Sequence, residues 1–225
     1  MSAPPPYSRV PHLVAGRGTE DDRVLSAAEA TALLSRPVAV EEKLDGANVV
    51  LWLEGSRIEC ALRSGPGSAD RAGQLGPLRA WMAERSDQLR ALVADGMALY
   101  AEWLYLTHSV AYDRLPAYLV TLDLRSPDGT FATVDDRNER CAARGMATPA
   151  KLYRGVVEKV DALEPLLAQS RYASGPAEGV IVRALDGAEP RLAKLLNAGF
   201  RRLGDDEWAG GRPRNLLADR ERSWR

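Results

Sequence analysis

Lys43 is the side chain in this sequence best placed for covalent chemistry. It lies in the stretch EEKLDGAN, residues 41–48, between two apolar runs that the pattern predicts as strands joined by a tight turn into a hairpin. A lysine at such a junction is held by rigid backbone while its amine can face a cleft. An amine attacks an electrophile only when it is neutral, and the reference pKa of lysine is about 10.4. Neighbouring cations and burial must therefore lower the pKa of Lys43, because the carboxylates beside it would raise it.

Other charged side chains stand in or beside predicted strands. Glu102 is the single acidic residue inside the apolar run 97–106, where burial is costly unless the carboxylate is paired or has a task. Glu178 stands at the entrance of the run 178–183. Arg63 ends one predicted strand and Lys194 lies inside another. Taken singly, each has a simpler interpretation: a solvated strand-end cation, a salt-bridged core carboxylate, or a turn residue.

Composition bounds the class of protein. With 225 residues, 45% hydrophobic and 27% charged, the chain suits one globular domain that buries a sizeable core. A formal net charge of −1 gives no overall nucleic-acid signature, so a polyanionic partner must meet local basic groups. Two cysteines suit a reducing compartment. No run is long enough to span a membrane and the N-terminus lacks a signal core, so we expect a cytoplasmic protein.

The order of predicted elements indicates an α+β protein. Residues 1–10 are proline-rich and are expected to be a flexible N-terminus. The hairpin 38–53 is followed by strands and helices in alternating groups. Further strands are predicted at 57–63, 97–106, 118–124, 130–134, 151–153, 178–183 and 192–196, and helices at 27–34, 78–93, 135–144 and 159–170.

The same charged residues, taken in order, resemble the motifs I, Ia, III, IIIa, IV and V of covalent nucleotidyltransferases. The resemblance is greatest to ATP-dependent RNA ligases of the second phage type, which include RNA-editing ligases and bacterial relatives. Motif I of that family reads Glu-Lys-x-x-Gly-x-Asn, which Glu42, Lys43, Gly46 and Asn48 match. Segments 11–13 (with the later Asp21 and Asp22), 107–112 and 193–195 also look like the bacterial relatives. The likeness covers roughly residues 7–208.

This resemblance implies a fold and a reaction. The fold is an adenylyltransferase domain (ATP-grasp-like, ligase-type), with antiparallel sheets, flanking helices and a nucleotide cleft between the sheets. The reaction is ATP-dependent joining of RNA 5′-phosphate and 3′-hydroxyl ends in RNA repair, through AMP carried on Lys43. The implied cofactors are ATP and Mg²⁺ (or Mn²⁺). The implied partners are RNA ends and an end-healing polynucleotide kinase/phosphatase, with no membrane.

The resemblance also implies a role for each site residue. Lys43 is the catalytic nucleophile, and Glu178 and Glu102 are the metal ligands. The implied ATP- or AMP-binding residues are Glu42, Leu44, Asn48, Arg63, Glu102, Leu122 and Lys194. Among these, Glu42 would lie by the adenine, Glu102 and Arg63 by the ribose, and Lys194 at the α-phosphate. His12 and His108 are expected to be structural or rim residues.

Some features depart from the family pattern. Leu122 stands where an aromatic ring usually stacks on adenine, and Leu192 fills the slot of a second motif V lysine, whose charge Arg191 could supply. The expected domains are an adenylyltransferase domain at 11–203 and a basic C-terminal tail at 204–225, with no OB-fold and no separate C-terminal domain. Strand binding would fall to this domain, to a partner, or to the arginines at 201, 202, 212, 214, 220, 222 and 225.

Two other functions remain open from the sequence. The chain could deliver AMP to a different acceptor, such as a DNA end, a small molecule or a protein. It could also be a ligase-like module that binds ATP or RNA without turnover.

Overall fold

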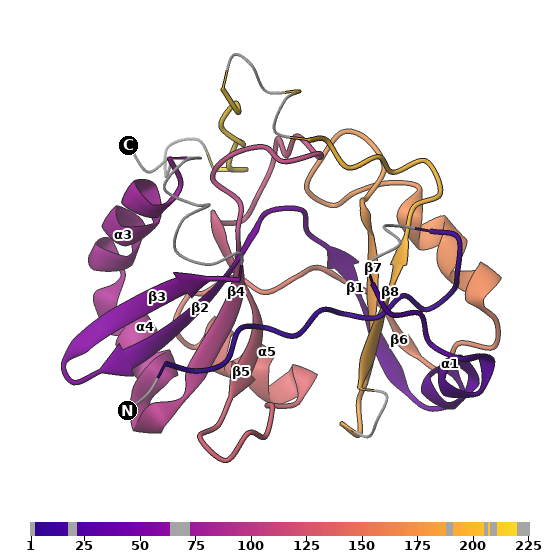
Figure 1. Ribbon diagram of the computed structural model, residues 1–225, viewed down its shortest axis with the longest axis horizontal. Helices are drawn as coiled ribbons and strands as arrows, with labels where there is room; N and C mark the ends of the chain where they lie inside the picture. The colour runs from indigo at the N-terminus through magenta and orange to yellow at the C-terminus, as the bar shows by residue number, and fades with distance from the viewer. Residues whose placement is uncertain are drawn as a thin grey trace.

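Two four-stranded antiparallel sheets form the framework of the protein (Figure 1). The computed structural model describes residues 3–17, 22–63, 73–187, 191–204, 207 and 211–219. Sheet A has the strand order β6-β1-β7-β8, and its strands are β1 (Val38–Lys43), β6 (Lys151–Gly155), β7 (Gly179–Ala184) and β8 (Leu192–Leu196). Sheet B has the order β3-β2-β4-β5, and its strands are β2 (Ala47–Glu54), β3 (Arg57–Leu62), β4 (Ala98–Trp103) and β5 (Leu119–Arg125).

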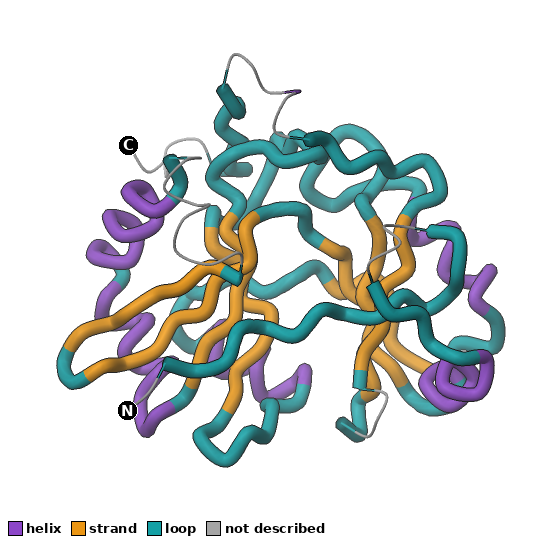
Figure 2. Tube along the Cα trace, viewed as in Figure 1, coloured by secondary structure: helices purple, strands orange, loops and turns teal. Residues whose placement is uncertain are grey.

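Helices cover the outer faces of the two sheets (Figure 2). Two helices lie on the outer side of sheet B, α3 (Leu75–Glu84) and α4 (Ser86–Val93), and end in the 3-10 turn η1 (Ala94–Gly96). Sheet A packs against α1 (Ala27–Leu34) and the 3-10 helix η2 (Val160–Leu167). The helix α5 (Val134–Ala142) contacts β5. Each sheet therefore has an apolar core on its outer side. The inner face of sheet B carries polar side chains and a smaller apolar cluster around Tyr7 and Tyr100.

The alternation of residues along the strands assigns side chains to these faces. On β1, Val38 and Val40 pack into the core of sheet A, so Glu41 and Lys43 project from the opposite face. On β7 and β8 the same period places Ile181 and Lys194 with them, and those two residues face each other across the pairing. Arg183, two residues after Ile181, lies on the same face of β7, so a pattern with period two brings charges from three strands to one inner surface.

The expected hairpin between 38–43 and 47–53 is wrong. β1 pairs with β6 and β7, whereas β2 pairs with β3 and β4, so the two strands belong to different sheets. The chain crosses from sheet A to sheet B through Leu44–Gly46. Strand-turn-strand patterning fits a hairpin locally, but each apolar run had better partners elsewhere in the chain. The segment Leu44–Gly46, directly after Lys43, therefore connects sheet A to sheet B.

Three further expectations need correction. The predicted single helix at 78–93 is broken into α3 and α4, because Arg85 leaves the helical conformation. The predicted helix at 159–170 is the 3-10 helix η2, with Pro165 inside it. The predicted strand at 130–134 is reduced to a bridge between Phe131 and Arg125. The α+β class with antiparallel sheets and flanking helices is confirmed.

The N-terminal segment runs across both sheets (Figure 1). Residues 3–10 have no helix or strand, but they are anchored where the sequence predicts a flexible end. Tyr7 is buried and packs on the ring of Tyr100 in β4, and its hydroxyl donates to Asp123 in β5. Further on, Leu13 donates from its backbone N–H to the carbonyl of Lys194 in β8. The segment therefore ties sheet B to sheet A.

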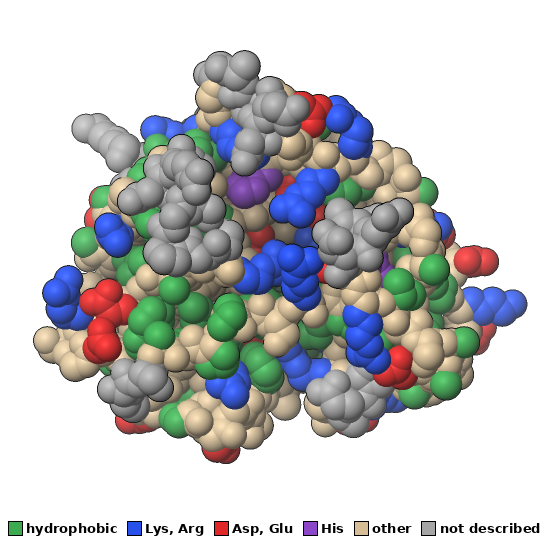
Figure 3. All heavy atoms as spheres, in the orientation of Figure 1, with side chains coloured by type: hydrophobic (Ala, Val, Ile, Leu, Met, Phe, Trp, Pro, Cys, Tyr) green, Lys and Arg blue, Asp and Glu red, His purple; other side chains and the backbone are tan. Residues whose placement is uncertain are grey.

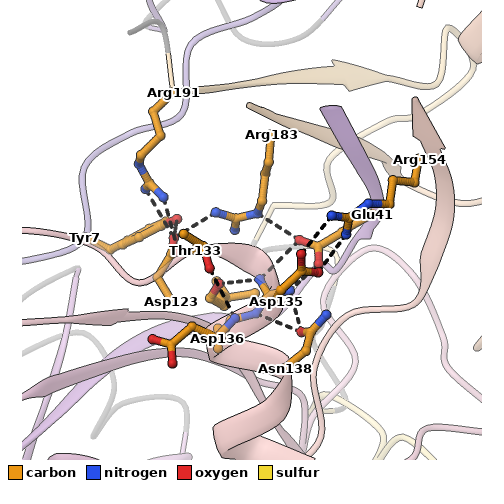
Figure 4. A network of polar contacts seen from close by, with 12 residues as sticks. Tyr7, Glu41, Asp123, Thr133, Asp135, Asp136, Asn138, Arg154, Arg183 and Arg191 are labelled. Carbon is orange, nitrogen blue, oxygen red and sulfur yellow. Dashed lines mark hydrogen bonds and ion pairs between the residues drawn. The ribbon is translucent and has the colours of Figure 1, made fainter. Parts of the chain in front are cut away.

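A buried ionic network also joins the two sheets (Figure 4). Arg183 of β7 donates to Glu41 of β1 at 2.8 Å and to Asp123 of β5 at 2.9 Å. Arg137 of α5 bonds the same Glu41 carboxylate, and Arg191 reaches Asp123 at 3.2 Å. Burial makes each unpaired charge costly, so the network holds the sheets in one arrangement.

Part of the C-terminal tail is built into the fold. Asn215 is 1% exposed, and its side chain donates to the Leu104 carbonyl at 2.9 Å and accepts from Thr107 and from the Tyr112 backbone. The expected tail arginines at 220, 222 and 225 lie outside the described residues. No helix among the described residues is long and apolar enough to cross a membrane.

Candidate active site

A cavity of about 690 Å³ opens between the inner faces of the two sheets. Lys and Arg side chains gather over the middle of the face that spans both sheets (Figure 3). The cavity is lined by eight of the nine side chains expected from sequence, namely Glu42, Lys43, Leu44, Asn48, Arg63, Glu102, Leu122 and Lys194. The ninth, Glu178, contacts Lys43 directly. The tertiary structure therefore brings together residues spread over 150 positions of sequence, a separation shown by Lys43 and Lys194.

Lys43 ends β1 with its amine among carboxylates. The ammonium Nζ lies 2.7 Å from Oε2 of Glu178. Burial by itself lowers the pKa of Lys43, but the carboxylates of Glu178, Glu102 and Asp45 outweigh it and raise the pKa above the usual lysine value. The amine is therefore protonated in this arrangement, and a ligand must change its surroundings before it can attack.

Glu178 is placed by the strand that follows it. Gly179 pairs with Lys43 across β1 and β7, which brings the preceding carboxylate to the amine. A Cβ at position 179 would lie 2.5 Å from the Leu195 carbonyl oxygen, so only glycine fits between β7 and β8 here. Burial raises the pKa of Glu178 to about 7, although the Lys43 ammonium opposes the rise. This carboxyl group changes charge near neutral pH.

Glu102 is a core carboxylate with fixed partners. It accepts from the Gly46 backbone N–H at 3.0 Å and from the Asn48 amide at 3.2 Å. Burial raises its pKa, and the Lys43 ammonium, Asn48 and Arg63 favour the charged form. The Glu102 side chain thereby fixes the crossing from β1 to β2 and keeps Asn48 pointed into the cavity.

The loop 107–112 holds the residue two positions after Lys43. Asp45 accepts from the backbone N–H groups of Ser109 at 2.5 Å and Val110 at 3.2 Å. The Asp45 backbone N–H donates to the Tyr112 hydroxyl at 2.8 Å. Because Asn215 fixes the same loop from behind, the C-terminal segment supports the catalytic end of β1.

Lys194 points into the cavity from β8, where its ammonium lies 2.5 Å from the Asp22 carboxylate. Burial lowers the pKa of Lys194, and the ion pair with Asp22 opposes that change. Arg191 does not supply a second cation beside Lys194. Its guanidinium pairs with Asp123 and lies 4.0 Å from the centre of the Phe131 ring, on the network side of the sheet.

The walls that could hold a base are apolar on both sides. Leu122 from sheet B and Ile181 from sheet A both line the cavity. Glu42 lines it too, but its carboxylate turns away from the cavity. It accepts from the Ser170 hydroxyl at 2.5 Å and from the Arg171 backbone at 2.7 Å. Any contact between Glu42 and a base would therefore come from its backbone.

The carboxylates fit a metal that shares its ligands with substrate. Within the described part of the chain, no three His, Cys, Asp or Glu side chains are grouped closely enough to hold an ion alone. Mg²⁺ commonly binds one or two carboxylates and completes its shell with water and phosphate oxygens. Glu178 fits this role best, since both oxygens of Glu102 already accept hydrogen bonds.

Sequence reasoning missed Tyr7, Arg9 and Arg183 as cavity residues, and it noted Asp22 only as part of the family resemblance. Tyr7, Arg9 and Asp22 line the cavity from the N-terminal segment, and Arg183 lines it from β7. His12, expected to be structural, lies 3.7 Å from Asp22 and next to Lys194 on the neighbouring backbone. A run of prolines gave no signal of burial. One hint was Tyr7, an aromatic residue close to Arg9 in a segment that is otherwise predicted to be flexible.

Comparison with known proteins agrees with this arrangement. Residues 36–196 match the RNA ligase family. The chain belongs to the RNA ligase family. The match begins just before β1 and ends with β8, so it spans Lys43, Glu102, Glu178 and Lys194. A search of curated proteins by sequence found no match.

Solved structures of an RNA ligase from Naegleria gruberi share the fold of this RNA ligase family member. A variant of that enzyme with ATP and Mn aligns with a TM-score of 0.57 at 13% identity, over 84% of this chain and 55% of the other. The same enzyme with PPi aligns with a TM-score of 0.55 at 16% identity, over 87% and 61%. The chain therefore spans roughly half to three fifths of the solved ligases.

Proposed function

We propose that this RNA ligase family member is an ATP-dependent RNA ligase that carries AMP on Lys43 and joins RNA 5′-phosphate and 3′-hydroxyl ends. The observation that carries the proposal is the grouping of Lys43, Glu102, Glu178 and Lys194 around one cavity. A protein that only bound nucleotide would have no use for a buried lysine flanked by carboxylates, because both charges are costly to bury. Similarity to a ligase solved with ATP and Mn supports the choice of nucleotide and of a divalent metal.

In the first step the Lys43 nitrogen attacks the α-phosphorus of ATP. A P–N bond forms, the P–O bond to pyrophosphate breaks, and the leaving group takes the electron pair. Lys43 must first lose its proton to solvent, and the Glu178 carboxylate, 2.7 Å from the ammonium, opposes that loss by stabilising the charged amine. Lys194 and Arg63 offset the charge that grows on the phosphate oxygens.

A divalent metal, Mg²⁺ or Mn²⁺, would supply positive charge at the phosphates and at Glu178 when bound. Glu178 would hold this ion, and its carboxylate would then stabilise the Lys43 ammonium less. Glu102, fixed by Gly46 and Asn48, then orients the ribose side of the nucleotide.

In the later steps AMP moves to RNA. An oxygen of the RNA 5′-phosphate attacks the α-phosphorus and the P–N bond breaks, with Lys43 regaining a proton. The RNA 3′-hydroxyl then attacks the 5′-phosphorus and AMP leaves. Ends of this type are what a kinase/phosphatase leaves behind, so we propose a role in RNA repair beside an end-healing enzyme.

Intact mass spectrometry after incubation with ATP and Mg²⁺ tests the proposal. The native chain should gain one AMP, about 329 Da, and Lys43→Ala should not. Addition of a 5′-phosphorylated RNA should remove the adduct and yield a sealed strand. An adduct that RNA cannot discharge would point to another AMP acceptor. A folded protein that forms no adduct, from a sample not already adenylylated, would refute the ligase proposal in favour of a binding module.

A further inference from the structure

The segments 11–13 and 23–25 extend sheet A beyond β8, directly beside Lys194. The backbone N–H of Lys194 donates to the Pro11 carbonyl at 2.9 Å, and the Leu13 N–H donates to the Lys194 carbonyl at 2.8 Å. His12 in turn donates from its backbone to the Arg23 carbonyl at 2.8 Å. This added layer brings side chains from the N-terminal segment to the end of the cavity where Lys194 lies.

The carboxylate of Asp22 lies where these side chains converge. Oδ2 of Asp22 is 2.5 Å from Nζ of Lys194, and Oδ1 is 3.0 Å from a guanidinium nitrogen of Arg9. Nε2 of His12 lies 3.7 Å from the same Oδ2. The pKa of Asp22 is held to about 2, where hydrogen bonds from Lys194 and Arg9 outweigh the opposing effect of burial. Asp22 is thus an anion inside a set of three donor groups.

His12 is incompletely satisfied in this arrangement. Its side chain is 3% exposed, and among the described residues neither ring nitrogen has a hydrogen-bond partner. Burial lowers its pKa, so the ring is neutral and offers one N–H donor. Buried polar atoms in native proteins are nearly always paired, so a ligand could provide the partner that the imidazole does not find in the described part of the chain.

We propose that Arg9, His12 and Lys194 form a phosphate-binding subsite of the nucleotide cavity, occupied by the Asp22 carboxylate until a phosphate group displaces it. The inference rests on the proposed function, since the ligand is a phosphate of the nucleotide or of the RNA end. A phosphate oxygen in place of Oδ2 would keep the Lys194 contact and could come close enough to accept from His12. Asp22 and a phosphate cannot share these donors, because two anions at such short range repel each other.

The proposal gives opposite signs for two substitutions. Asp22→Asn removes the competing charge while keeping the shape, so a phosphate ligand should bind about tenfold more tightly. His12→Leu removes the free donor at a buried position, where an apolar residue of similar size is tolerated, so binding should weaken about tenfold. Asp113→Asn is the matched control. Asp113 also has a pKa held to about 2, through hydrogen bonds from Arg114 and Ser174, but it does not line the cavity.

Calorimetry on the full chain measures these effects with three probes: a non-reactive α,β-methylene analogue of ATP, adenosine, and an RNA oligonucleotide with either a 5′-phosphate or a 5′-hydroxyl. Adenosine binding should not change. A response limited to the ATP analogue assigns the subsite to the nucleotide, and one limited to the 5′-phosphate assigns it to RNA. Thermal melting of each variant verifies folding.

The inference is overturned if a folded Asp22→Asn variant binds every phosphate probe equally well or more weakly than the native chain. In that case the ion pair with Asp22 would serve only to position the Lys194 side chain. Formation of the Lys43 adduct, measured on the same samples, separates this failure from a failure of the proposed function. An adduct with no Asp22 effect refutes only the subsite.

Discussion

At the scale of single residues, the two lysines of the site each form an ion pair with a carboxylate. Lys43 is held by Glu178, and Lys194 by Asp22, so each lysine already contacts an anion before substrate arrives. Each ion pair offsets part of the free-energy cost of removing its two charges from water. Both lysines must therefore change partners when substrate binds. Under the two proposals, Lys43 must lose a proton, and Lys194 must exchange the Asp22 carboxylate for a phosphate.

The first prediction concerns the proton on Lys43. Glu178→Gln removes the closest of the carboxylates that raise the pKa of Lys43, so that pKa should fall. Mass spectrometry can follow the reaction of individual lysines with an amine-specific reagent as the pH is raised. Lys43 should begin to react at lower pH in the variant than in the native chain, while exposed Lys159 is unchanged. Equal titration of Lys43 in both proteins would show that Glu178 does not hold its proton.

The second prediction concerns metal binding. Because burial raises the pKa of Glu178 to about 7, its carboxyl group is protonated below that pH and charged above it. A metal needs the charged form, so apparent Mg²⁺ affinity should fall about tenfold for each pH unit below 7. The Mg²⁺ concentration that gives half-maximal adduct formation measures this. A half-maximal concentration that stays constant as the pH falls would mean that Glu178 is not the titrating ligand.

At the scale of elements, connections matter more than the strands themselves. The crossing Leu44–Gly46 carries the chain from sheet A to sheet B immediately after Lys43. Two contacts hold this crossing in place. The Gly46 N–H donates to Glu102, and Asp45 accepts from the backbone of the loop 107–112. A second layer, the segment that contains Asn215, holds that loop in place. The position of Lys43 is thus supported by a residue 172 positions later in the chain, the distance from 43 to 215.

The third prediction tests this support. Asn215→Ala leaves the Leu104 carbonyl, the Thr107 hydroxyl and the Tyr112 N–H without their buried partner, which should cost about 1–3 kcal/mol or more of unfolding free energy. Leu216→Ala is the control, because that side chain is 43% exposed and should change stability by less than about 0.5 kcal/mol. Urea denaturation compares the two. Similar, small losses for both would show that the segment is not a support of the loop.

At the scale of the whole molecule, two sheets with separate cores must be held at a fixed separation. The main cores of sheet A and sheet B lie on their outer sides, and only a smaller apolar cluster around Tyr7 and Tyr100 lies on the inner face of sheet B. The N-terminal segment and the network around Glu41, Asp123 and Arg183 make the connection instead (Figure 4). These ionic contacts hold the two sheets together at one side and leave the cavity open, whereas apolar side chains packed between the sheets would fill it.

The fourth prediction follows from the sign of the Asp123 shift. Burial would raise its pKa, but Arg183, Arg191 and Tyr7 outweigh it and lower the pKa below 3.8. The charged form therefore contributes stability that is fully present above pH 3.8 and is lost as the pH falls through the lowered pKa. Asp123→Asn should lose about 3–5 kcal/mol near neutral pH and less in acid. A stability difference that is independent of pH would contradict this account.

The sequence by itself determined the types of element and most of the site. Short apolar runs bounded by turn residues identify β1, β2, β4, β7 and β8, and most of their residues are buried. Lys43, Glu102 and Lys194 stand out because a charge inside an apolar run needs a reason. The order of these residues was enough to expect an RNA ligase family member.

Only the tertiary structure decided which strands pair and which distant segments line the cavity. The pattern around Lys43 fits a hairpin as well as a crossing, because pairing depends on partners far away in sequence. Tyr7 and His12 lie in or beside the proline-rich start of the chain and Asp22 lies in a charged loop, so no local pattern predicts what they pack against. Their proximity to Lys194 and Asp123 arises from long-range packing, which a local pattern does not encode.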